Sequence, residues 1–330
     1  MDIVELQHIY AGHPNAKALA AEWENPSVRT VFLGGLHTSA SPLFFSALVK
    51  EQSHTFVFIL SDLEEAGYFY HDLVQINGDA EVLMFPSSYR RAIKYGQKDA
   101  AYEILRTEVL SRLQKQEKVC IVTYPDALAE KVVSQKDLAG NTLQVEVGQC
   151  IGTDVLVDRL LDDGFQQVDY VYEPGQFALR GSIVDVFSFA SEYPYRIDFF
   201  GDEVDSVRTF EVETQLSKEK KQSVSIIPEL TAMEGGEYVS FFDFLPQDTI
   251  LGMKDFLWIR ERIETIHGEA VSPLAVAADA ECEAELSDIG NHLIDGTDFT
   301  QKALEFRRME FGNMPTGIPQ AKLMFNVEAQ

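Results

Sequence analysis

The strongest constraint on the fold is a stretch in which apolar and polar residues alternate and then meet a tight turn. Residues 195–200 read YRIDFF, and a period of two places Arg196 and Asp198 on the face of a strand opposite to its apolar side chains. Gly201-Asp202 follows and leads into a second strand-like run, Glu203–Phe210. The pattern predicts a β-hairpin, and therefore an antiparallel sheet in this part of the chain.

An arginine beside a glycine interrupts two apolar runs just upstream of this hairpin. Pro174-Gly175 is a turn signal, and Phe177–Leu179 and Ile183–Phe187 are typical of strands on either side of Arg180-Gly181. Arginine is favoured in protein interfaces because its planar guanidinium makes several directed hydrogen bonds. Arg180 is therefore either an exposed anchor for a partner or the ion-pair partner of a local carboxylate such as Asp185.

The composition is typical of a globular protein with more than one domain. The chain has 330 residues with a hydrophobic content of 45%, so two or three domains are expected. It has no apolar run long enough to span a membrane and no basic region at its N-terminus of the kind that signal peptides carry. Cys120, Cys150 and Cys282 lie far apart. We therefore expect a cytoplasmic chain with no membrane partner, no disulfide framework and no zinc site.

The formal net charge of −26 argues against general binding to nucleic acid, because such a field repels phosphates. One local basic patch is a candidate exception, and it consists of Arg90, Arg91, Lys94 and Lys98. The run Asp279–Asp288 is acidic and is interpreted as a solvated helix face, with partner binding as the alternative. A chain this acidic is more typical of a protein-binding module than of a protein that tracks along DNA.

The first part of the chain alternates between strand-like and helix-like segments. Residues 61–64, SDLE, match a capping box that opens a helix ending near Gln75. This alternation predicts an α/β domain, a parallel sheet covered by helices on both faces, which we place at residues 1–126. The expected strands are 30–33, 55–60, 81–85 and 118–124, and the other expected helices are 1–22, 43–50, 99–116 and 127–133.

The character of the sequence changes over residues 127–213. A helix at Asp154–Asp163 is followed by closely spaced strands with hairpin signals, which predicts an α+β domain with an antiparallel sheet. Residues 214–330 are expected to complete the first domain, because a buried strand and a helix return there. The segments concerned are a lysine-rich joint at Lys218–Lys221, a short strand at Val224–Ile227, a buried strand at Thr249–Met253 and a helix at Phe256–Ile266.

The hairpin region also carries a family resemblance. EPGQFALRGSIVDVF, followed by PYRIDFFGDEVDSVRTF, resembles the second domain of the UvrB-homology module. That module occurs in the excision-repair helicase UvrB and at the N-terminus of Mfd-type transcription-repair coupling factors, and weaker similarity runs over nearly the whole chain. The resemblance implies a RecA-like, P-loop-helicase-like domain that is interrupted by the inserted α+β domain.

A working member of this fold would hold nucleotide in a P-loop after the first strand. A P-loop needs backbone amides around the phosphates, a lysine to neutralise them and a hydroxyl for Mg²⁺. Registered on Gly35, the chain has Ala40, Ser41 and Pro42 where the second glycine, the lysine and the hydroxyl residue would stand. Pro42 also lacks the backbone N–H that a helix N-terminus would offer to a phosphate.

A second motif of the family points the same way. Lys254 falls where the resemblance would place the Mg²⁺-holding aspartate, and a cation there repels Mg²⁺. Asp255 falls where the water-activating glutamate would be and is one methylene shorter. With both motifs degenerate, we expect this chain to be no enzyme and to use no cofactor, ATP and Mg²⁺ included. The rival hypothesis is a UvrB-like, nucleotide-dependent DNA-binding or helicase domain.

The lack of a further feature also favours the coupling-factor branch over UvrB itself. The stretch Pro86–Gln97 is too short for the aromatic hairpin that UvrB inserts at damaged DNA, and it offers only Tyr89 and Tyr95 for stacking. The chain ends at Gln330, where the resemblance would continue into an RNA-polymerase-binding domain and a motor. We therefore expect a fragment of an ATP-dependent DNA translocase whose absent domains bind RNA polymerase and double-stranded DNA.

The resemblance also implies a partner for the inserted domain, the damage-recognition protein UvrA. Carried over by position, Arg180 matches an arginine of the shared RG motif, and Gly181 beside it permits close approach. The flanking Phe177 and Phe187 complete the expected contact, and the secondary candidates are Arg196 and Arg208. UvrB often has a further arginine two residues before the RG motif, where this chain has Ala178, so the contact is expected to be electrostatically weaker or shared with other residues.

Overall fold

The computed structural model describes residues 3–36, 40–51, 54–78, 81–88, 100–230, 236–271 and 292–325. The chain divides into two compact units. We call them the parallel-sheet unit, which comprises Met1–Ser87, Arg112–Val132 and Val239–Gln330, and the antiparallel-sheet unit, which comprises Ser88–Ser111 and Val133–Tyr238. The first unit is thus interrupted by the second.

The parallel-sheet unit is built on a seven-stranded sheet in which every pairing is parallel. Its strand order is β17-β1-β16-β15-β2-β4-β3. The central strands are buried throughout, which is typical of parallel sheets covered on both faces. The α/β architecture expected from the sequence is confirmed. The strands are β1 (Thr30–Gly34), β2 (Phe56–Ile59), β3 (Val82–Met84), β4 (Cys120–Thr123), β15 (Ile250–Met253), β16 (Arg307–Gly312) and β17 (Ala321–Met324).

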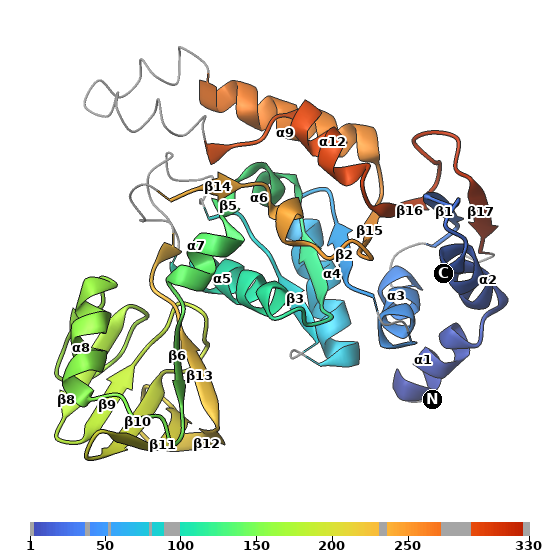
Figure 1. The fold of residues 1–330 in the computed structure, drawn as a ribbon. Coiled ribbons are helices and arrows are strands. Elements are labelled where there is room, and N and C mark those ends of the chain that lie inside the picture. The colour runs from blue at the N-terminus through green and yellow to red at the C-terminus, as the bar shows by residue number, and fades with distance from the viewer. Residues whose placement is uncertain are drawn as a thin grey trace. The chain divides into compact units, whose positions relative to one another are not determined.

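Helices alternate with these strands along the chain and cover the sheet (Figure 1). Helix α3 packs against α1 and α4, and α9 packs against α6 and α12. The helices of this unit are α1 (Ile3–Ala11), α2 (Pro14–Glu24), α3 (Ala40–Glu51), α4 (Leu63–Asn77), α6 (Pro125–Ala129), α9 (Phe256–Val271) and α12 (Gly296–Ala303), with a 3₁₀ turn, η2, at Phe241–Phe244. Helix α5 (Ala100–Gln114) falls mostly in the antiparallel-sheet unit.

Three helices differ from the sequence prediction. The helix expected over residues 127–133 is instead α6, which ends at Ala129, and residues 132–133 form a strand. The helix expected over residues 1–22 is divided into α1 and α2, because Pro14 restricts the preceding His13 to an extended conformation. The imidazole Nδ1 of His13 then accepts a hydrogen bond from the backbone of Asn15 and caps α2. In α4 the capping residue is Asp62 rather than Ser61, since its carboxylate accepts the backbone N–H of Glu65 at 2.9 Å.

The antiparallel-sheet unit contains a six-stranded sheet of order β12-β11-β10-β9-β8-β7 and a separate pair of β6 and β13. Helix α8 packs on one face of the larger sheet through Leu156 and Leu160. The elements are α7 (Gln135–Gly140), β6 (Leu143–Glu146), α8 (Thr153–Asp162), β7 (Gln166–Gln167), β8 (Gln176–Arg180), β9 (Ile183–Val186), β10 (Tyr195–Phe200), β11 (Glu203–Phe210), β12 (Ser217–Lys221) and β13 (Ser223–Ile226). Strands β5 (Val132–Val133) and β14 (Tyr238–Val239) pair where the chain passes between the units.

The predicted hairpin is present. Strands β10 and β11 pair in antiparallel fashion around a turn at Gly201, whose φ of +64° favours glycine. Ile197 and Phe199 are buried in the core under α8, as the alternation predicts. A register shift between Asp198 and Phe199 marks a β-bulge.

The boundaries of the inserted domain differ from those expected at 126/127 and 213/214. Strand β12 pairs with β11, and β13 pairs with β6. The lysine-rich joint and the strand after it therefore extend the antiparallel-sheet unit instead of returning to the parallel sheet. The joint is a strand with every residue exposed, so its sequence lacks the alternation that would have predicted it.

Several predicted features lie outside the described residues, namely Tyr89, Tyr95, the basic patch of Arg90, Arg91, Lys94 and Lys98, and the acidic run Asp279–Asp288. Within the described ranges, no helix is long and apolar enough to cross a membrane.

Candidate protein-binding site

The two faces of the six-stranded sheet differ sharply in character. One face is apolar and forms the core with α8. The other bears charged side chains, because residues at alternate positions of a strand point to the same side. Strand pairing places a row of residues directly opposite one another on this second face, from β8 to β12: Ala178, Asp185, Arg196, Arg208 and Lys220. We call this charged side of the sheet the arginine face.

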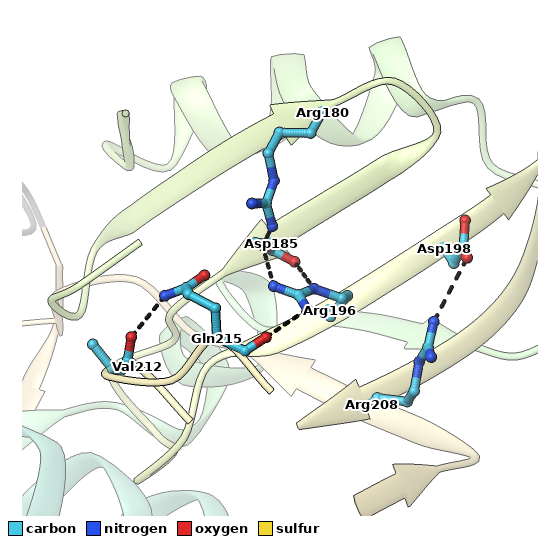
Figure 2. A network of polar contacts seen from close by, with 7 residues as sticks. All are labelled: Arg180, Asp185, Arg196, Asp198, Arg208, Val212 and Gln215. Carbon is cyan, nitrogen blue, oxygen red and sulfur yellow. Dashed lines mark hydrogen bonds and ion pairs between the residues drawn. The ribbon is translucent and has the colours of Figure 1, made fainter. Parts of the chain in front are cut away.

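Asp185 is the centre of the arginine face, and its side chain is only 1% exposed. The guanidinium of Arg196 donates two parallel hydrogen bonds to it, from Nε to Oδ1 at 2.8 Å and from Nη2 to Oδ2 at 2.9 Å. Arg180 makes an ion pair with the same carboxylate (Figure 2). A buried carboxylate is stable only when paired and hydrogen-bonded, and here two guanidiniums fulfil both conditions.

Arg196 is held on every side. Its side chain is 14% exposed, and its Nη1 donates to the backbone carbonyl of Gln215 at 3.0 Å. Its guanidinium lies 4.4 Å from the ring centroid of Phe210, a cation–π distance. Gln215 has a φ of +59°, a left-handed conformation that is uncommon for a residue with a Cβ. Arg196 is thus a fixed structural cation that also borders the surface.

Arg180 combines the two roles that the sequence left open. It forms the ion pair with Asp185, while its side chain remains 35% exposed. The guanidinium lies 5.3 Å from the ring centroid of Tyr170, which is itself exposed. Asp185 thus holds one end of the guanidinium in place and leaves its other N–H groups near the surface, the arrangement that suits an interface arginine.

The remaining partner-binding candidates lie in different surroundings. Gly181 has a φ of +63° in the turn between β8 and β9, so the turn itself requires a glycine. Phe177 is buried in the core under α8, and Phe187 is buried in a smaller cluster that includes Ala178 and Phe210. Both rings therefore support the arginine face from within and present no side chain to a partner in this conformation.

Arg208 is held by fewer and longer contacts than Arg196. Its Nη2 lies 3.6 Å from Oδ2 of Asp198, and both side chains are about a third exposed. Its Nε is shielded from solvent and has no hydrogen-bond partner within the described part of the chain. Arg208 is therefore held by one longer ion pair, and its side chain remains 31% exposed.

Sequence reasoning missed one residue of this surface. Phe200 is 83% exposed, and it follows Arg196 and Asp198 at the spacing that places all three on the same side of β10. The signal was present in the sequence: in YRIDFF the last phenylalanine stands at a polar position of the alternation. A large exposed aromatic residue on the same side of a strand as an ordered arginine is typical of interface anchors.

Gly35, on which the expected degenerate P-loop is registered, has a structural explanation within the parallel-sheet unit. It has a φ of +84°, and a Cβ built on it would lie 2.1 Å from the backbone oxygen of Phe325. Close approach of the chain after β17 thus requires the glycine. Ala40, Ser41 and Pro42 form the buried first turn of α3, while residues 37–39 lie outside the described ranges.

Lys254 and Asp255 also have structural partners. Lys254 makes an ion pair with Glu65 of α4. Burial opposes ionisation of Glu65, but hydrogen bonds from Lys254 and Ser61 outweigh it and lower the pKa of that carboxyl. Asp255 accepts a hydrogen bond from the backbone N–H of Trp258 at 2.9 Å and so caps α9. Lys254 and Asp255 therefore each have a structural role within the parallel-sheet unit.

A cavity of about 660 Å³ lies at the carboxyl ends of β1, β2, β15 and β16, where parallel α/β sheets usually bind ligands. Three residues of the expected degenerate nucleotide site, Ser41, Pro42 and Lys254, line it, together with Glu65 and Asp72. Two carboxylates therefore accompany one ammonium group. Such a set of charges disfavours a polyphosphate.

Comparison with known protein families gives a match within the antiparallel-sheet unit. Residues 143–231 match the family model of the UvrB interaction domain. This range begins at β6 and ends after β13, so it includes all of the arginine face.

Relatives that match over 59% of this chain agree with that family match. The chain is 31% identical over 196 residues to the transcription-repair-coupling factor of Bacillus subtilis (strain 168), a match that covers 59% of this chain and 17% of the relative. It is 27% identical over 198 residues to the factor of Escherichia coli (strain K12), with the same shares covered. The chain thus spans 17% of the length of these two relatives. The resemblance inferred from the sequence is confirmed.

Proposed function

We propose that this chain is a non-catalytic docking module of a transcription-repair coupling factor, and that its arginine face binds UvrA. Binding of UvrA would recruit nucleotide excision repair to RNA polymerase stalled on the transcribed strand. The similarity to transcription-repair-coupling factors supports the coupling role, and the match to the UvrB interaction domain supports a partner of the UvrA type.

One observation carries the proposal: Asp185 fixes two guanidiniums on a surface within the matched domain. Ordered arginines bind better than mobile ones, because less side-chain entropy is lost when a partner docks. Arg180 provides exposed donors, and Phe200 provides exposed apolar area on the same side of the sheet. An arginine and an aromatic residue are the common anchors of protein interfaces.

Calorimetric titration of UvrA into the chain tests this proposal. Arg180→Ala is expected to weaken binding by about 2 kcal/mol, or roughly thirtyfold, as for a typical interface hot spot. Lys136→Ala is the matched control, because Lys136 is an exposed cation on α7 of the same unit. Equal affinity of the two variants would remove Arg180 from the interface, and absence of binding by the unmodified chain would refute the proposal.

The rival function is a UvrB-like nucleotide-dependent activity. The cavity at the carboxyl ends of the parallel strands is the observation that favours it. We propose that this chain neither binds nor hydrolyses ATP, since the P-loop lysine is replaced by Ser41 and the ion pair of Lys254 with Glu65 stands where Mg²⁺ would be held. Equilibration with ATP and Mg²⁺ tests this directly, and micromolar affinity or turnover would favour the rival.

The wider role belongs to a longer protein. We propose that this module works in the cytoplasm as part of an ATP-dependent DNA translocase, whose other domains bind RNA polymerase and double-stranded DNA. The relatives, of which the chain spans 17%, support this context through their name, transcription-repair-coupling factor.

A further inference from the structure

The charged row on the arginine face continues beyond the residues that contact Asp185. Arg196 on β10 lies directly opposite Arg208 on β11, and Arg208 lies directly opposite Lys220 on β12. Like charges that face each other across strands destabilise a sheet. Three cations in one row therefore need either internal counter-charges or an external anion.

Neutralisation of these cations by carboxylates of the chain decreases along the row from Arg196 to Lys220. Arg196 has two short hydrogen bonds to the buried carboxylate of Asp185. Arg208 has only a 3.6 Å contact with Asp198, and its Nε has no partner within the described residues. Lys220 has no ion pair in the part of the chain that the structure describes. The positive charge is thus least neutralised at the edge strand.

The edge strand β12 is suited to contact a partner. It reads SKEKK, every residue is exposed, and it is the last strand on its side of the sheet. The lysines on either side of Lys220 are engaged: Lys218 lies 3.6 Å from the ring centroid of Tyr193, and Lys221 pairs with Glu219 at 2.7 Å. Lys220 is the cation that continues the row of Arg196 and Arg208.

We propose that the docking surface extends from Arg180 across β11 to β12, and that Arg208 and Lys220 bind carboxylates on the surface of the protein partner. The inference rests on the proposed function, because it names the chemistry of the same partner. The side chain of Arg208 is 31% exposed, and a guanidinium suits a carboxylate because its planar N–H groups can donate two parallel hydrogen bonds to it.

Carboxylates fit this row better than the phosphates of a nucleic acid. The formal net charge of the chain is −26, and such a field opposes the approach of a polyanion. A protein surface presents its carboxylates singly and adds neutral contacts beside them. Exposed Phe200, on the same side of the sheet, would gain from such neutral contacts.

Charge reversal of Lys220 tests the inference. Lys220→Glu is expected to weaken binding of UvrA about tenfold at low salt, because it sets a carboxylate against the partner's carboxylates. The control is Lys136→Glu, which makes the same change of charge on exposed α7 and is expected to stay within about twofold of the unmodified chain. The difference between the variants should shrink at high salt, since exposed charges are screened.

The outcomes separate this inference from the function on which it rests. If Arg180→Ala weakens binding while Lys220→Glu equals its control, the extension to β12 is wrong and the proposed function stands. If the unmodified chain does not bind UvrA, both fall. If Lys220→Glu abolishes retention of double-stranded DNA and leaves UvrA affinity at the control value, the row binds phosphates and the inference is overturned.

Discussion

Replacement of Asp185 by asparagine removes the charge that holds the arginine face together. The side chain of Asp185 is 1% exposed and is shared by Arg180 and Arg196. Breaking a buried ion pair by removing one partner costs about 3–5 kcal/mol, because the other charge stays buried. Arg196 is in that position, whereas Arg180 is 35% exposed and can turn into solvent. We therefore expect the low end of the range, about 3 kcal/mol.

Hydrogen exchange is the appropriate assay for this loss. Both tryptophans, Trp23 and Trp258, belong to the parallel-sheet unit, so tryptophan fluorescence does not report on the sheet that Asp185 stabilises. Amides of β9 and β10 report on it directly, since their exchange rates follow the free energy of local opening. A loss of about 3 kcal/mol corresponds to exchange roughly a hundredfold faster.

Asp205→Asn provides the matched control, because Asp205 is an exposed carboxylate on neighbouring β11. A surface change of this kind is expected to stay within about 0.5 kcal/mol. If Asp185→Asn exchanges no more than about threefold faster than this control, the reasoning is refuted. The two guanidiniums would then be stable without their carboxylate, and Asp185 would not organise the face.

Three further predictions follow from single contacts. Phe200→Ala is expected to weaken binding of UvrA by at least about 1 kcal/mol in calorimetry while leaving the melting temperature unchanged, because its ring is exposed. Asp255→Ala removes the cap of α9 and is expected to cost about 1 kcal/mol of stability, followed by the fluorescence of Trp258 during urea unfolding. Folding lowers the pKa of Glu65, so its stabilising contribution is present above the pKa of the unfolded state and is lost as pH falls through the lower, folded value. Glu65→Gln should therefore flatten the acid side of the stability profile of the parallel-sheet unit, and an unchanged profile would show that the ion pair with Lys254 contributes nothing.

Periodicity and turn signals predicted the α/β class and strands β1, β2, β3, β4 and β15 of the parallel sheet, but not β16 and β17. The apolar runs that became β2, β4 and β15 are continuous because parallel strands are buried on both faces. The alternation in β10 predicted which of its side chains enter the core, and Ile197 and Phe199 are buried there. These features depend on local sequence and on burial, and both leave a regular pattern.

The features that the sequence did not disclose depend on contacts between distant residues. Strand β12 is exposed along its whole length, so it lacks an apolar period and is a strand only because β11 provides hydrogen-bond partners. The role of Asp185 as the shared partner of two arginines depends on the register of β8, β9 and β10. From sequence spacing, Asp185 was only one possible ion-pair partner of Arg180. The structure shows that Arg196 binds the same carboxylate.

The most direct test of the central claim is a hydrogen-exchange footprint of the chain with and without UvrA. We predict slower exchange at the turns Gly181-Ser182 and Gly201-Asp202 and along the exposed edge strand β12, all of which border the arginine face. Amides of the parallel-sheet unit are predicted to exchange at unchanged rates. Protection confined to the parallel-sheet unit, with β8–β12 unaffected, would contradict the claim that the arginine face is the docking surface.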